Sequence, residues 1–153
     1  MTTTLLTPSV LKYCRNNDNS RVTKKENYYV ILDLGSIDNF FIDTAAVKNQ
    51  TTEHTPIKVT LPDSTKLQST HACTIDLLQI PHPANQGYIL PRMKSHSLIS
   101  VTKLCKAGCT VSFGERDCIV SKNGNDLIRG TKNTTNGLWY IPQAACCILG
   151  TSD

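Results

Sequence analysis

The sequence predicts an all-β domain: a small closed β-barrel or sandwich with a projecting hairpin and a single short helix. Strong helix formers are scarce whereas Thr, Ser and Asn are abundant, and this composition favours strands and turns. Short apolar or alternating segments also recur between turn signals along most of the chain. With 153 residues, of which 39% are hydrophobic, the chain has room for one domain with a modest core.

The first expected strands flank a glycine turn. Residues 1–26 are rich in Thr, Asn and Lys without sustained periodicity, and we expect a flexible leader or linker there. Residues 28–32 form a continuous apolar run of strand length, which predicts a strand buried on both faces. Residues 40–42, after the turn, form a second short apolar strand.

A long hairpin is predicted next. Ile57, Val59 and Leu61 alternate with polar residues and indicate a half-buried strand. The Pro-Asp-Ser-Thr sequence of residues 62–65 bends the chain, and residues 67–78 are expected to return as one long strand. This hairpin is long enough to project from a small domain.

The second half is expected to contain the helix and a meander. After a break at residues 81–83, residues 87–91 predict a strand. The spacing of apolar residues predicts a helix over about 97–106, with Ser97 or Ser100 as its cap. The remaining expected strands are residues 109–113, 118–122, 127–130 and 138–141, with a hairpin turn at Asn123-Gly124.

Charge and cysteine usage limit the partners. The net charge of +4 is dispersed, so no direct nucleic-acid binding is predicted. No apolar stretch has the length of a membrane span and the start lacks signal-peptide features, so we expect a soluble, intracellular chain without a membrane partner. The seven cysteines include no Cys-x-x-Cys pair, which favours buried thiols in a reducing cytosol over a metal shared by Cys105, Cys109 and Cys118. No metal or other cofactor is predicted.

The most informative motif is Asp33-Leu34-Gly35, directly after the apolar run of residues 28–32. An acidic residue that ends an apolar strand and enters a glycine turn is how one half of an aspartic peptidase site is built. Such a site needs two carboxylates sharing one proton, so that one activates water and the other donates to the substrate carbonyl. A chain of this length with one candidate has to supply the second carboxylate by two-fold symmetric dimerisation.

The segments after Asp33 follow an order that resembles retropepsins, the retroviral-type aspartic proteases. The order is a strand, the Asp-x-Gly turn, a flap hairpin, an apolar pair, a short helix and a Gly-Cys-Thr-apolar-polar-Phe segment at residues 108–113. The chain is more similar still, over about residues 28–142, to the protease region of copia-type LTR retrotransposon (gag-pol) polyproteins. The segments that carry this resemblance are Ile57-Lys58-Val59-Thr60-Leu61-Pro62-Asp63, Gln68-Ser69-Thr70-His71, Ser95-His96-Ser97-Leu98-Ile99-Ser100, Leu104-Cys105-Lys106-Ala107-Gly108-Cys109 and Asn136-Gly137-Leu138-Trp139-Tyr140-Ile141-Pro142.

The resemblance implies roles for three groups of residues. Asp33 takes the position of the catalytic aspartate, and its active-site loop continues through Leu34, Gly35 and Ser36. The flap that would cover a substrate has at its turn Leu61, Pro62, Asp63, Ser64 and Thr65. The second loop of the site consists of Leu98, Ile99 and Ser100.

The resemblance also implies a domain organisation and partners. Residues 27–142 would be the retropepsin-like domain, with residues 118–142 leading into a pre-integrase-like region and residues 143–153 as a tail. The domain would act as a homodimer on an extended peptide or polyprotein. Its location would be a reducing intracellular one, the cytoplasm or a virus-like particle.

Three departures from the family pattern leave alternatives open. Leu34 stands where Ser or Thr would hydrogen-bond across the dimer, and a leucine offers neither donor nor acceptor. Asp38 adds a negative charge that is expected to disfavour ionisation of a dyad, and the flap turn lacks its usual glycine, which predicts a stiffer tip. Three interpretations therefore remain open. The chain is a peptidase, whose activity Leu34 either impairs or leaves intact. Otherwise it is an inactive retroelement remnant that serves as a dimerisation or peptide-binding module, or an unrelated all-β binding domain.

Overall fold

The computed structural model describes residues 3–5, 29–61, 63–77, 79–93 and 96–142, and every structural statement below concerns these residues. Most of the expected leader, the turn residue Pro62, Ser95 of one family-like segment and the expected tail at residues 143–153 lie outside them. Three residues of the expected leader, Thr3–Leu5, form a short strand, β1.

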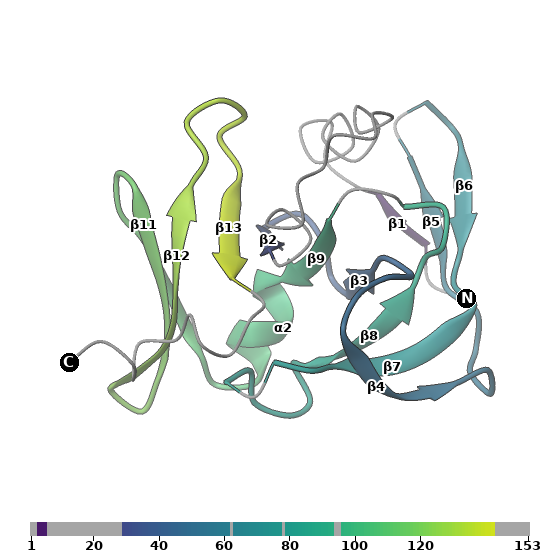
Figure 1. Cartoon of the computed structure of the whole chain (residues 1–153), viewed down its shortest axis with the longest axis horizontal. Helices are drawn as coiled ribbons and strands as arrows, with labels where there is room; N and C mark the ends of the chain where they lie inside the picture. The colour runs from purple at the N-terminus through teal and green to yellow at the C-terminus, as the bar shows by residue number, and fades with distance from the viewer. Residues whose placement is uncertain (1–2, 6–28, 62, 78, 94–95, 143–153) are drawn as a thin grey trace.

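Most of the described chain forms one ten-stranded sheet (Figure 1), in the order β10-β11-β12-β13-β2-β9-β3-β8-β7-β4. Its strands are β2 Tyr29–Asp33, β3 Asn39–Phe41, β4 Val47–Thr51, β7 His71–Ile75, β8 Gln86–Ile89, β9 Ser97–Ser100, β10 Thr110–Phe113, β11 Asp117–Lys122, β12 Asn125–Lys132 and β13 Trp139–Pro142. The expected all-β class is confirmed. No closed barrel is found among the described residues, because β10 and β4 remain at opposite ends of the strand order.

The expected helix over residues 97–106 is wrong in its first turn. Residues Ser97–Ser100 form β9, and the helix α2 comprises only Val101–Lys106. The strand lies between β2, to which it is parallel, and β3, to which it is antiparallel. All four of its residues are buried, because core clusters cover both of its faces, with Leu98 in one cluster and Ile99 in the other. A short apolar run that is buried on both faces cannot be distinguished from a helix by periodicity alone.

The expected long strand over residues 67–78 is also wrong, because it divides between two sheets. β5 Lys58–Thr60 and β6 Lys66–Gln68 form a short antiparallel hairpin, and β1 adds to the outer edge of β5 in a separate three-stranded sheet. β7 then pairs with β8 and β4 of the large sheet. The division falls at Ser69, which lies between the end of β6 and the start of β7. The Ser69 hydroxyl accepts a hydrogen bond of 2.9 Å from the Ile57 amide.

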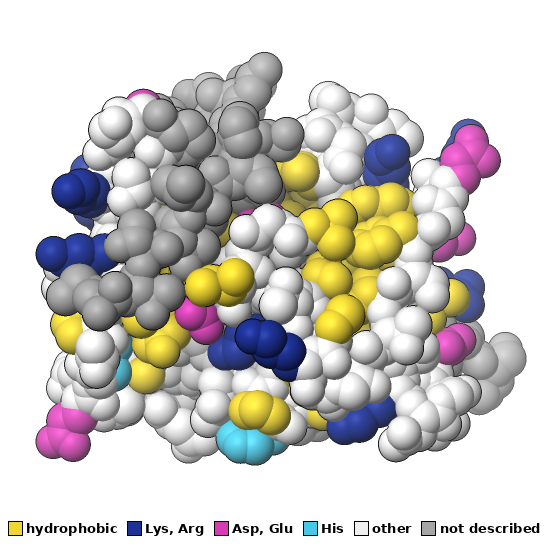
Figure 2. Space-filling view, turned by 180° about the vertical axis from the view of Figure 1, so that it is seen from behind, with side chains coloured by type: hydrophobic (Ala, Val, Ile, Leu, Met, Phe, Trp, Pro, Cys, Tyr) yellow, Lys and Arg dark blue, Asp and Glu magenta, His cyan; other side chains and the backbone are white. Residues whose placement is uncertain are grey.

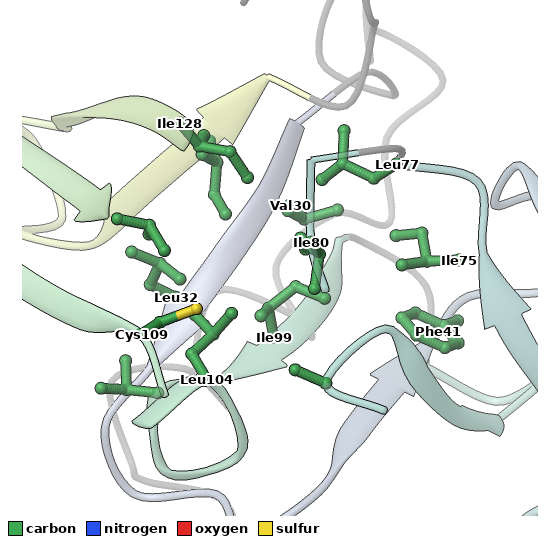
Figure 3. Packing of buried hydrophobic residues seen from close by; sticks show 14 of the residues in the cluster. Val30, Leu32, Phe41, Ile75, Leu77, Ile80, Ile99, Leu104, Cys109 and Ile128 are labelled. Atoms are coloured by element: carbon green, nitrogen blue, oxygen red, sulfur yellow. The ribbon is translucent and has the colours of Figure 1, made fainter. Parts of the chain in front are cut away.

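The core consists of two clusters on opposite faces of β2. The Val30 cluster contains Val30, Leu32, Ile99 and Leu104 among others, and Figure 3 shows Leu32, Leu104 and Cys109 packed together beside β2. The Ile31 cluster contains Ile31, Phe40, Leu98 and the buried residues of the β5–β6 hairpin, which are Ile57, Val59, Leu61 and Leu67. Burial of β2 on both faces is thus as expected from its continuous apolar sequence.

Candidate active site

Asp33 lies at the carboxyl end of β2, where the chain leaves the sheet. It is paired in register with Ser100, the last residue of the parallel strand β9. Because side chains alternate along a strand, Asp33 faces the same side of the sheet as Ile31. That is the side which the β5–β6 hairpin covers through the Ile31 cluster.

The Asp33 carboxylate is buried and only half satisfied. Its side chain is 2% exposed, and Oδ1 accepts a hydrogen bond of 2.8 Å from the Gly35 amide. Oδ2 is buried without a hydrogen-bond partner among the described residues. Burial raises the pKa of Asp33 above its ordinary value, and the Gly35 hydrogen bond opposes this effect more weakly. The carboxyl group therefore binds a proton more readily than an exposed aspartate does.

Asn39 fixes the far end of the loop that begins at Asp33. This fully buried side chain donates to the carbonyls of Ala84 at 2.6 Å and Gln86 at 2.8 Å, and its Oδ1 accepts from the Ser100 amide at 2.7 Å. One side chain thereby joins the loop to the segment before β8 and to the end of β9. All of its described hydrogen bonds are to backbone groups, so its role is to hold the position of the loop.

Ser100 connects the same loop to α2. Its hydroxyl donates to the Ser36 carbonyl at 2.6 Å and accepts from the Lys103 amide at 3.1 Å, which makes it the helix N-cap. Ser36, also buried, uses its own hydroxyl to bond the Asp38 carbonyl at 2.6 Å. The expected second loop and the Asp33 loop are therefore joined by direct hydrogen bonds.

Two apolar side chains of the Asp33 loop point out of the domain. Leu34 is 63% exposed and Ile37 is 49% exposed, although the domain has a substantial core in which to bury such residues. They flank the buried Ser36 in sequence and lie within four residues of Asp33. The loop that begins at the buried carboxyl group thus exposes two apolar side chains. Apolar side chains also reach the surface elsewhere on the domain (Figure 2).

Asp38 does not stand as an isolated negative charge. Its carboxylate lies 3.5 Å from the ammonium of Lys103, which also donates to the Gln86 carbonyl at 2.7 Å. The pKa of Tyr88 is raised by burial and, to a smaller extent, by the charge of Asp38. The expected effect of Asp38 concerns a dyad of two carboxyl groups and stays a prediction.

The described residues of the expected flap, which are Leu61 and Asp63 to Thr65, are joined by hydrogen bonds at the tip of the β5–β6 hairpin. The Leu61 amide donates to the Thr65 carbonyl at 2.8 Å, and the Ser64 amide donates to the Leu61 carbonyl at 2.9 Å. Leu61 is buried in the Ile31 cluster, whereas Asp63 and Ser64 are exposed. Ser64 takes a φ of 70°, the left-handed conformation in which glycine is usual.

Other candidate groups lie away from Asp33. A pocket of about 320 Å³ is lined by Gln86 and Lys103 together with residues of β4, β7 and β8, but not by Asp33. Among the described residues no three His, Cys, Asp or Glu side chains gather as metal ligands. Of the cysteines considered for a metal, Cys105 is exposed while Cys109 and Cys118 are buried in the Val30 cluster.

Comparison with protein-family models, with curated proteins and with solved structures finds no match to this chain. In the part of the chain that the structure describes, no helix is long and apolar enough to cross a membrane.

Sequence reasoning selected Asp33 and residues 98–100 as site residues, but residues 98–100 belong to the strand β9 and do not form the expected loop. It did not select Asn39, which joins the Asp33 loop to the end of this strand. The available signal was a polar residue directly before the apolar pair Phe40-Phe41, a position at which a buried amide needs several backbone partners.

Proposed function

We propose that this chain is a retrotransposon-derived aspartic endopeptidase-like domain that cleaves an extended peptide or polyprotein as a homodimer. The observation that carries the proposal is the Asp33 carboxyl group, which is buried at the end of a strand with Oδ2 unpartnered. A buried polar atom without a partner is costly, at about 1–3 kcal/mol. A second carboxyl group that shares a proton with Asp33 would satisfy this atom.

The second carboxyl group would be Asp33 of another copy of the chain. A two-fold axis brings the same residue of two subunits together, which is the simplest way for a single aspartate to form a dyad. The exposed Leu34 and Ile37 support such an interface because burying an exposed leucine contributes up to about 2 kcal/mol. In this dimer an apolar contact of Leu34 replaces the hydrogen bond that a Ser or Thr would make.

The chemistry follows from two carboxyl groups that hold one proton. The ionised group takes a proton from water as the water oxygen attacks the peptide carbonyl carbon, while the protonated group gives its proton to the carbonyl oxygen. The tetrahedral diol then collapses and the C–N bond breaks, as one diol hydroxyl gives its proton to the ionised carboxylate and the leaving nitrogen takes the proton of the other carboxyl group. The products are a carboxylic acid and an amine, and the dyad returns to one proton. The raised pKa of Asp33 favours the protonated partner that this cycle needs.

The β5–β6 hairpin supports the substrate side of the proposal. It covers the face of β2 toward which Asp33 points, and its tip at Asp63 and Ser64 is exposed. A hairpin in this position would lie over an extended peptide bound beside Asp33 and exclude water from the reaction.

Leu34 favours a second candidate function, an inactive remnant that acts as a dimerisation or peptide-binding module. The leucine retains an apolar contact surface but cannot brace the two Asp33 loops by hydrogen bonds, and catalysis depends on such bracing more than dimerisation does.

Cleavage of a peptide library by the full chain at mildly acidic pH separates these functions. The peptidase proposal expects cleavage that is lost in Asp33→Asn and retained in Asp126→Asn, which changes an exposed aspartate of β12. No cleavage by a folded dimer, with cleavage gained in Leu34→Thr, would support the inactive module. A chain that is a folded monomer at every concentration contradicts the peptidase and the dimerisation module, because both need a dimer.

A further inference from the structure

The geometry points to a peptide-binding edge on β5, occupied in this chain by its own Thr3–Leu5 segment. β1 runs parallel to β5 with Thr3, Thr4 and Leu5 in register with Lys58, Val59 and Thr60. The two strands are far apart in sequence, with residues 6–28 and β2 to β4 between them. An extended segment from elsewhere in the chain has thus added to the hairpin as a third strand (Figure 1).

The edge of β5 suits this role because the hairpin is firmly held. Val59 is fully buried and pairs across the hairpin with the buried Leu67, so the inner face of the hairpin is fixed in the Ile31 cluster. Among the described residues, β5 pairs only with β6 and β1. Without β1, the edge opposite β6 would present unpaired backbone donors and acceptors on a rigid support. This is the arrangement by which proteins bind extended peptides as an added strand.

The occupant identifies the kind of partner. Thr3–Leu5 is a short uncharged segment that begins with two threonines, which favour extended structure, and it pairs with β5 in the parallel direction. A three-residue strand makes few hydrogen bonds, so a peptide supplied at sufficient concentration can displace it. An extended, uncharged peptide that runs parallel to β5 would compete with it for the same edge.

Peptide binding at the β5 edge does not require the domain to be an enzyme. The effect of β1 on peptide cleavage, in contrast, rests on the proposed function. If the domain cleaves peptides, β1 occupies part of the substrate platform and acts as an internal competitor. Removing β1 from the edge would then lower the KM for a peptide supplied in trans without raising kcat.

Amide hydrogen exchange tests the edge without requiring cleavage. The full chain carrying Asp33→Asn, which keeps the probe peptide intact, is compared with the same chain carrying Thr3→Pro and Thr4→Pro. Neighbouring residues of a strand direct their backbone groups to opposite sides, so one of the two prolines must remove a donor that faces β5. We expect the β5 amides that face β1 to exchange about tenfold faster or more in the proline variant, while those that face β6 remain protected.

A synthetic peptide of residues 1–9 supplies the second arm. It should restore protection of the β5 edge in the proline variant, bind the unsubstituted chain more weakly, and lose both effects when it carries the two prolines. Equal exchange at β5 in the two chains would overturn the proposal, as would equal binding of the peptide to both. A failed cleavage assay with these exchange results intact would count against the peptidase proposal alone.

Discussion

Substitution of Asn39 by alanine tests the central feature of the site scaffold, which is that one buried amide holds the Asp33 loop. The substitution removes the hydrogen bonds to Ala84, Gln86 and Ser100. After the substitution the Gln86 carbonyl still accepts a hydrogen bond from the Lys103 ammonium. The Ala84 carbonyl and the Ser100 amide lose their hydrogen bonds to Asn39 without such a second partner. At about 1–3 kcal/mol for each buried group, the expected loss is about 2–6 kcal/mol of unfolding free energy.

Urea denaturation at a fixed protein concentration measures this loss by linear extrapolation. Asn125→Ala, at an exposed position of β12, is the matched control and should change stability by less than about 0.5 kcal/mol. Ser100→Ala and the double variant complete a mutant cycle, in which we expect a coupling of about 0.5–3 kcal/mol because the two residues share one network. A loss below about 1 kcal/mol for Asn39→Ala, or strict additivity with Ser100→Ala, would refute the assigned role.

Three further outcomes follow from burial and backbone conformation. Since burial raises the pKa of Asp33, this residue ionises first in the unfolded chain as the pH rises, so its contribution to stability falls from about pH 4 upward. Asp33→Asn should therefore match the wild type in urea titrations below about pH 4 and exceed it increasingly above, and a variant no more stable at pH 7 contradicts the pKa shift. Under native conditions iodoacetamide should modify the exposed Cys105 at least about tenfold faster than the buried Cys73, Cys109 and Cys118. Peptide-resolved mass spectrometry measures these rates, and equal rates would contradict the burial of the three thiols. Gly124→Ala should lower the free energy of unfolding by about 1–2 kcal/mol in urea denaturation, because the φ of 79° is unfavourable for alanine. Steric contact adds nothing to this loss, since an added Cβ would meet no atom within 4 Å. An unchanged midpoint would contradict the turn geometry.

Much of the fold could be predicted where the local sequence and the tertiary environment agree. β2 was predicted from a continuous apolar run, and it is buried on both faces as that run requires. β5 was predicted from alternation, with Val59 buried and Lys58 exposed. The turn at Asn123-Gly124 has positive φ at both residues, which the hairpin between β11 and β12 needs.

The errors arose where pairing over long sequence distances decides the structure. β4 was missed because its sequence is polar and its last four residues are exposed, so no apolar pattern indicates it. β9 was taken for a helical turn because a strand that is covered on both faces carries no alternation.

The candidate site was predictable only in part for the same reason. Asp33 stands out in sequence because it ends an apolar strand before glycine, whereas Asn39 and Ser100 gain their roles from partners 45 to 64 residues away. The exposure of Leu34 was not expected from the sequence either, since a leucine beside a buried strand is usually buried itself.

The most direct test of the proposed function mixes wild-type chains with Asp33→Asn chains. The two are unfolded together and refolded, so that subunits combine at random, and peptide cleavage is measured at constant wild-type concentration. If each site contains Asp33 from two subunits, an equal amount of the variant should reduce cleavage to about half, because only dimers of two wild-type subunits remain active. Cleavage that is unchanged by the added variant, or that persists in Asp33→Asn alone, would contradict a shared Asp33 dyad.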